Sequence, residues 1–170
     1  TPSQKRHVAI PLALTLLLAS GALRAAEEPP TLPIQRLTME TALKMATAAI
    51  AQCRKEGMNI AVTVVDRGGN AQIVLRDTLA MDLTLTISKQ KAYTAMSFNS
   101  PTSQLETRFK TPFSVGKVEG LVMAAGGVPV TAGGTILGGI GVSGSPSGET
   151  DERCAKAGFD AIRTELEMSL

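Results

Sequence analysis

Histidine and aromatic residues are scarce in this sequence, and their scarcity excludes several kinds of site. The chain has one histidine, no tryptophan, one tyrosine and four phenylalanines among its 170 residues. The single histidine, His7, lies within the first 26 residues, so residues 27–170 contain no imidazole. Catalysis, metal binding and haem ligation by histidine are therefore excluded for residues 27–170. With so few aromatic side chains, alanine, valine, leucine and methionine must fill the core.

Residues 1–26 have the organisation of a secretory signal peptide. Lys5 and Arg6 precede an uncharged stretch over residues 8–23, and small residues follow it. The stretch is shorter than the roughly 20 apolar residues of a membrane-spanning helix, and Pro11 interrupts it. We therefore expect an exported protein, periplasmic or extracellular, with no stable membrane anchor. The alternative is a buried core helix.

The charge that remains after removal of this segment is small. Three of the 17 basic residues lie in the segment, which leaves 14 basic and 15 acidic residues and a net charge of −1. Residues 27–170 therefore have no excess of basic charge that would indicate nucleic-acid binding. Residues 27–37 read as a proline-rich lead-in, and residues 38–170 are long enough for a single domain with its own core.

The hydrophobic pattern of residues 38–170 predicts an α+β fold in the order α-β-β-α-(α)-β-β-β-α. We expect helices over residues 38–56, 83–99 and 149–168, with a further short helix after Pro101. We expect strands over residues 59–66, 71–76, 121–125, 128–131 and 135–144. Because short glycine turns join consecutive strands, the sheet should be five-stranded, largely antiparallel and covered by helices.

Periodicity also predicts which side chains share one face of each helix. Thr38 is the expected N-cap of the first helix, and Gly57 the expected left-handed residue after it. The buried face of the first helix is predicted to hold Ala42, Met45, Ala46, Ala49, Ile50 and Cys53. The second helix should present one face with Leu83, Ile87, Lys91, Thr94 and Phe98. The last should bury Ala155, Phe159, Ile162 and Leu166.

One glycine motif, Gly139-x-Gly141-x-x-Gly144, matches the spacing of a dinucleotide-binding turn. Such a turn needs a helix and a second parallel strand after it, and only 26 residues follow Gly144. We therefore interpret Gly138, Gly139 and Gly141 as strand residues that permit close backbone approach or a bend.

Four short motifs, in this order, resemble the GlcG/HbpS family, the haem-degrading or haem-binding domain that also occurs at the C-terminus of some corrinoid adenosyltransferases. They are Val65-Asp66-x-Gly68-Gly69-Asn70, residues 91–95 (KAYTA), Gly126-Gly127-Val128-Pro129, and Gly138–Gly144 followed by Asp151-Glu152. The resemblance covers about residues 37–166. The chain departs from the family at Ala125, where a third glycine is frequent, and in the segment over residues 109–120.

The resemblance implies a central antiparallel sheet and a homo-oligomer. Exported members of the family are associated with binding haem and iron, and cytoplasmic members with glycolate or diol metabolism. We therefore expect an exported protein that buffers, senses or hands on haem or iron, with a sensor or transporter as a possible partner. The alternatives are a binding protein or enzyme for a small hydroxy acid, or a non-catalytic oligomeric accessory protein. No catalytic constellation is visible, and haem degradation is implied by the resemblance alone.

Without histidine, a haem site needs a flat apolar slot, an oxygen or sulfur ligand and cations for the propionates. Tyr93 is chemically the stronger oxygen ligand, whereas the resemblance favours Thr94. The sequence has no C-x-x-C-H motif, so the haem would be non-covalent. Other candidate haem-binding residues are Lys91, Phe98, Arg76, Arg108, Met123, Gly126, Gly127 and Pro129. The alternative is that these side chains pack the core or lie in solvent.

Glu149 and Glu152 are candidate ligands for ferric iron. Their spacing of three residues equally fits acids that favour the N-terminus of a helix.

Cys53 and Cys154 lie on or beside the apolar faces of the first and last helices. They would form a disulfide if the two helices pack together, and are otherwise separate buried thiols.

Overall fold

The computed structural model describes residues 29–111 and 114–169. The predicted signal peptide, residues 1–26, therefore lies outside the described residues. The described residues from Ile34 onward form one compact unit, and those before it belong to a separate unit. No helix among the described residues has the length and apolar character needed to cross a bilayer.

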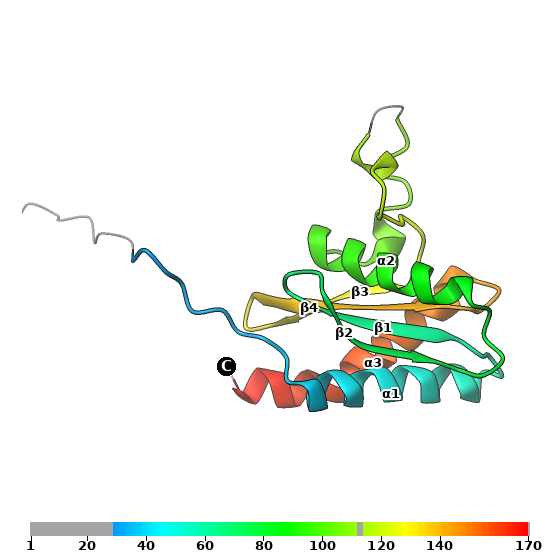
Figure 1. Cartoon of the computed structure of the whole chain (residues 1–170), viewed down its shortest axis with the longest axis horizontal. Coiled ribbons are helices and arrows are strands. Elements are labelled where there is room, and N and C mark those ends of the chain that lie inside the picture. Colours follow the sequence, from blue (N-terminus) through cyan, green and yellow to red (C-terminus); the bar gives the residue numbers. More distant parts are fainter. Residues whose placement is uncertain (1–28, 112–113, 170) are drawn as a thin grey trace, which may run out of the picture. The chain divides into compact units, whose positions relative to one another are not determined.

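The described residues form three α-helices and four strands, which confirms the α+β class (Figure 1). The elements are α1 (Met39–Lys55), β1 (Ala61–Asp66), β2 (Ala71–Arg76), α2 (Leu83–Phe98), β3 (Gly127–Ala132), β4 (Thr135–Ser143) and α3 (Gly148–Ser169). Two 3-10 turns, Thr102–Gln104 and Val115–Lys117, follow α2. The strands form one antiparallel sheet in the order β2-β1-β4-β3.

The predicted strand over residues 121–125 is wrong, so the sheet has four strands instead of five. In this segment, two backbone N–H groups bond to side chains, and that of Leu121 bonds to the Val118 carbonyl in a turn. The Val122 amide donates to the Thr94 hydroxyl at 3.0 Å, and the Ala125 amide donates to the Glu106 carboxylate at 2.7 Å. This apolar segment is therefore a loop that is hydrogen-bonded to Thr94 of α2 and to Glu106, which follows α2.

Helices α1 and α3 lie together on one face of the sheet (Figure 1). The six residues predicted for the buried face of α1 are all buried, and so are the four predicted for α3. Thr38 caps α1 by accepting from the Thr41 amide, and Gly57 has a left-handed φ of 77°. Val62, Ile140 and Val142 of the sheet, with Ile60 just before β1, complete this core.

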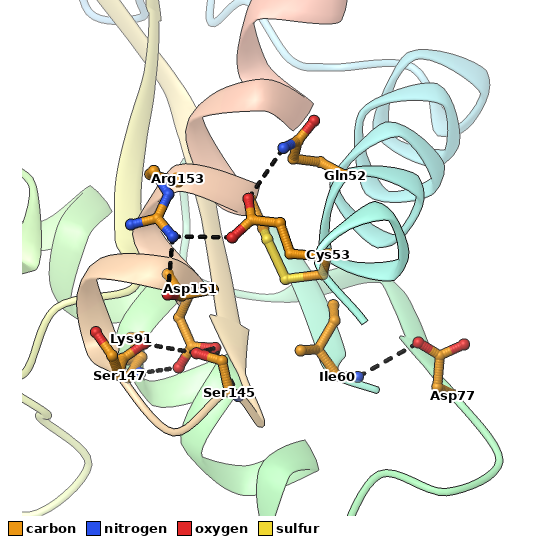
Figure 2. Close-up of a disulfide and its surroundings, with 12 residues drawn as sticks. Gln52, Cys53, Ile60, Asp77, Lys91, Ser145, Ser147, Asp151 and Arg153 are labelled. Atoms are coloured by element: carbon orange, nitrogen blue, oxygen red, sulfur yellow. Dashed lines mark hydrogen bonds and ion pairs between the residues drawn. A yellow bond between two sulfur atoms is a disulfide. The ribbon is translucent and has the colours of Figure 1, made fainter. Parts of the chain in front are cut away.

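A disulfide between Cys53 and Cys154 joins α1 to α3, with the two Cα atoms 5.5 Å apart (Figure 2). Both cysteines are fully buried. The Glu56 carboxylate, at the end of α1, accepts from Arg153 at 2.8 Å and from Gln52 at 3.0 Å. These hydrogen bonds hold the pKa of Glu56 below its ordinary value.

Helix α2 lies on the other face and approaches β4 through glycine (Figure 1). A Cβ added at Gly139 would lie 2.4 Å from the Ala92 carbonyl oxygen, and one at Gly141 would lie 2.0 Å from that of Ser88. These distances confirm that the glycines permit close backbone approach. A Cβ added at Gly138 would instead lie 2.1 Å from the Val65 carbonyl oxygen of β1.

The face predicted for α2 is partly wrong. The five residues predicted to share a face differ in exposure, since Lys91 and Thr94 are buried and Leu83 is 53% exposed. The buried residues of α2 are small or polar: Thr84, Ser88, Lys91, Ala92, Thr94 and Ala95. A helix that packs directly on a glycine strand has room only for small side chains, so the usual apolar pattern is lost.

Candidate functional site

A cleft of about 750 Å³ lies between α2, the β1–β2 hairpin and residues 119–120. We call it the β2 cleft. Because glycines draw α2 onto β4, the helix contacts β2 least of the four strands. Strand β1 is consequently buried throughout, whereas Val74 of β2 is 48% exposed. The cleft is the space that this off-centre packing leaves.

The β2 cleft has apolar walls and a charged rim. Val74 and Leu85 line it, and the exposed side chains of Lys89 and Glu119 lie at its edge. Thr63 lies at its base, where its hydroxyl is hydrogen-bonded to that of Ser88 at 2.8 Å. A slot of this size, mostly apolar with a few polar groups, is typical of small-molecule sites.

Tyr93 lines the cleft and is 40% exposed. Its ring packs against the β1–β2 turn, where a Cβ added at Gly69 would lie 2.6 Å from the ring. Gly69 has a φ of 83°, and the turn is held by Asp66, whose Oδ1 accepts from the Gly68 and Asn70 amides at 2.8 and 2.9 Å. The V-D-x-G-G-N motif thus builds the turn against which the tyrosine ring packs.

A second cavity, of about 420 Å³, surrounds Lys91, and we call it the Lys91 pocket. The Lys91 ammonium donates to Asp151 Oδ2 at 3.0 Å, and both side chains are buried (Figure 2). The other Asp151 oxygen accepts from the backbone and hydroxyl of Ser145 at 3.0 and 2.8 Å. Gly126 and Gly127 leave room for Lys91: an added Cβ would lie 2.6 Å from its Nζ at Gly126 and 2.3 Å from its carbonyl oxygen at Gly127.

The remaining haem candidates do not line the β2 cleft. Thr94 is fully buried, and its hydroxyl accepts from the Val122 amide. Phe98 contacts Phe109 with ring centroids 5.3 Å apart, and the Arg108 guanidinium lies over the Phe109 ring. The others lie elsewhere: Arg76 donates to the Ala80 carbonyl, Met123 lies near Gly116, and Pro129 is in β3.

The two predicted iron ligands have different partners. Burial raises the pKa of Glu152, but hydrogen bonds from Lys156 and from the hydroxyl and amide of Ser103 outweigh it, so the net pKa is lowered. Glu149 is exposed, and a hydrogen bond from Ser147 lowers the pKa of its carboxyl. Within the described residues no group of three or more His, Cys, Asp or Glu side chains could hold a metal ion. Iron binding by this pair stays a prediction.

Sequence reasoning missed most of the residues that line both cavities. Lys89, Gln90 and Thr86 of the β2 cleft lie on the outer side of α2, which the apolar pattern treats as solvent-exposed. Glu106, Ser143 and Asp151 of the Lys91 pocket come from three separate segments. No sequence spacing relates those segments to one another. The one signal that could have been used is that a buried lysine such as Lys91 needs an acidic partner.

Comparisons with known proteins place the chain in a family. Residues 37–160 match the family described as "Haem degrading protein HbpS-like". The crystal structure of a double mutant of HbpS from Streptomyces reticuli is 40% identical, with a TM-score of 0.76, and the match covers 81% of this chain and 94% of that chain. The structure of the Klebsiella pneumoniae protein ORFY has the same TM-score at 25% identity, covering 81% and 97% of the two chains.

A curated relative shows the same relationship in sequence. An uncharacterized 15.0 kDa protein from the dhaT-dhaS intergenic region of Citrobacter freundii is 30% identical over 134 residues, which are 76% of this chain and 94% of the relative. The resemblance drawn from the four motifs is thereby confirmed, and the chain belongs to the HbpS-like (GlcG/HbpS) family.

Proposed function

We propose that this protein binds haem non-covalently outside the cytoplasm, where it buffers, senses or hands on the cofactor. The observation that carries the proposal is the β2 cleft, an apolar slot with a phenol on its wall and a cation at its rim. The family description and the signal-peptide pattern of residues 1–26 support it.

In this proposal Tyr93 is the axial ligand, because a phenolate oxygen is a known haem ligand and Tyr93 lines the cleft. Lys89, at the rim, would pair with a propionate. Thr94 would act indirectly, by holding the 121–125 loop through the Val122 amide. Because residues 27–170 contain no histidine to ligate the iron, we expect haem to bind weakly enough to exchange.

The test is a titration of the purified protein, without residues 1–26, with haemin, followed by its Soret band. A saturable, shifted band at about one haem per chain is expected. Tyr93→Phe should shift the band and weaken binding about tenfold or more, because the substitution removes the proposed bond to the iron and keeps the apolar wall. A band unchanged by Tyr93→Phe but altered by Thr94→Ala would refute the ligand assignment.

A matched pair of substitutions locates the site. Val74→Glu places a charge on the cleft wall, whereas Val118→Glu changes a valine of similar exposure, 55% against 48%, that does not line the cleft. We expect only the first to weaken haem binding. Equal effects of the two would show that haem binds elsewhere.

We also propose that the protein forms a homo-oligomer. Leu79 and Met81, in the segment between β2 and α2, are 79% and 60% exposed, and Leu83, the first residue of α2, is 53% exposed. A cluster of large exposed apolar side chains favours a protein contact. Light scattering during size-exclusion chromatography should report a multimer that Leu79→Asp with Met81→Asp dissociates; a monomeric wild-type protein would contradict this.

A further inference from the structure

The Lys91 pocket has hydrogen-bonding capacity that the rest of the chain does not use. An ammonium group has three donors, and Asp151 is the one acceptor found for Lys91 among the described residues. Lys91 is nevertheless 95% buried, since its exposed fraction is 5%. Its remaining N–H groups therefore require acceptors that the pocket itself must admit.

Ser143 is a second buried polar group at the base of this pocket. It is 6% exposed, and no hydrogen bond of its hydroxyl is found in the described part of the chain. Along β4 it follows Gly139 and Gly141 at alternate positions, so it faces α2, as they do. The Ser143 hydroxyl and the Lys91 ammonium thus belong to the same cavity.

The rim of the pocket is acidic. Glu106 and Glu149 line it and are exposed. Each carboxylate has one oxygen in a hydrogen bond, Glu106 to the Ala125 amide and Glu149 to the Ser147 hydroxyl, which leaves the other oxygen available in this part of the structure. Since Asp151 already balances Lys91, the excess charge of the pocket is negative.

We propose that the Lys91 pocket is a binding site for a small organic cation that carries a hydroxyl group close to its ammonium, that is, an amino alcohol. The ligand's hydroxyl oxygen accepts a hydrogen bond from the Lys91 ammonium at the base, and its O–H donates a hydrogen bond to the Ser143 hydroxyl oxygen. The ammonium is held by Glu106 and Glu149 at the rim. A small carboxylate is disfavoured, because it would add negative charge to a pocket that already has an excess of it. The site is separate from the β2 cleft and does not depend on haem binding.

The experiment compares three probes of similar size by NMR titration of the amides around the pocket. Ethanolamine has both groups, ethylene glycol has the hydroxyls without the charge, and glycolate has a hydroxyl with a negative charge. We expect saturable shifts at Ala125 and Ser143 with ethanolamine, weaker ones with ethylene glycol and the weakest with glycolate. Glycolate binding as tightly as ethanolamine, or shifts confined to the β2 cleft, would overturn the proposal.

Variants separate the two halves of the site. Glu106→Gln with Glu149→Gln should weaken ethanolamine binding about fivefold and leave ethylene glycol unchanged, because exposed ion pairs are weak and only the charged probe forms them. Ser143→Ala should weaken both probes. Glu119→Gln, a matched control at the rim of the β2 cleft, should change neither. An unchanged preference for ethanolamine in the double variant would refute the role of the two carboxylates.

Discussion

The two faces of the sheet are packed by opposite rules. On the face covered by α1 and α3, large apolar side chains interlock around a disulfide. On the face covered by α2, Gly139 and Gly141 of β4 approach the backbone of Ser88 and Ala92 closely. Both cavities lie on the α2 face. The cavity between α1 and β2 on the opposite face is smaller, about 290 Å³, against about 750 Å³ for the β2 cleft and 420 Å³ for the Lys91 pocket. We infer that one face supplies stability and the other supplies binding sites.

The largest expected effect comes from the α1–α3 face. Replacing both cysteines by alanine removes a bond between residues 101 apart in sequence. On the chain-entropy model, closing a loop of this length contributes about 4 to 5 kcal/mol to the free energy of unfolding. Urea unfolding should show a loss of that order, while Ser88→Ala on α2, which removes the hydrogen bond to Thr63, should cost about 1 kcal/mol. A loss below about 1 kcal/mol for the cysteine variant would contradict the assigned role of this face.

The α2 face should instead fail when a side chain is enlarged. Gly141→Ala would place a Cβ 2.0 Å from the Ser88 carbonyl oxygen, and backbone atoms cannot move aside cheaply. We expect a loss of about 3 kcal/mol in the free energy of unfolding, measured by urea titration.

Gly134→Ala is the control for this substitution. Gly134 has a φ of 76° and no atom within 4 Å of an added Cβ, so only backbone strain of about 1 to 2 kcal/mol applies. Equal losses for the two variants would show that contact with α2 is not the limiting factor.

The smallest effect should come from Glu152, which ties α3 to the segment after α2. Its folded-state pKa is lowered, so its stabilising contribution is present above the unfolded pKa of about 4.3 and is lost as the pH falls through the folded value. Glu152→Gln should cost about 1 kcal/mol at neutral pH and flatten the decline in stability between about pH 5 and 3. The exposed Glu167→Gln should leave that decline unchanged, and a wild-type curve without a decline would refute the linkage.

The contrast between the faces also explains what the sequence could predict. The α1 and α3 faces were predicted residue by residue, because uncharged apolar side chains, alanine included, recur there at helical spacing. The α2 face was predicted only in part: Leu83 is apolar yet exposed, and Ser88 is polar yet buried. There the controlling factor is backbone distance to Gly139 and Gly141, which a hydrophobic pattern does not encode.

The candidate sites were still less predictable. Tyr93 and Lys91 were identified by chemical type and by resemblance. They are two residues apart in sequence, yet they line different cavities. Their separation follows from the helical turn between them, which directs one toward the β2 margin and the other toward α3. Whether the cysteines pair also depended on the packing of α1 on α3, which the sequence left open.

The disulfide has a consequence for how the chain would respond to cutting. Every residue that lines the β2 cleft or the Lys91 pocket lies between Cys53 and Cys154, as do all four strands. The binding apparatus is therefore enclosed in a covalent ring of main chain closed by one sulfur bridge. A protease that nicks the exposed segment around Lys117 would open that ring without releasing a fragment, and the two pieces would separate only after reduction. A single backbone cut in this segment would therefore leave the two pieces covalently joined.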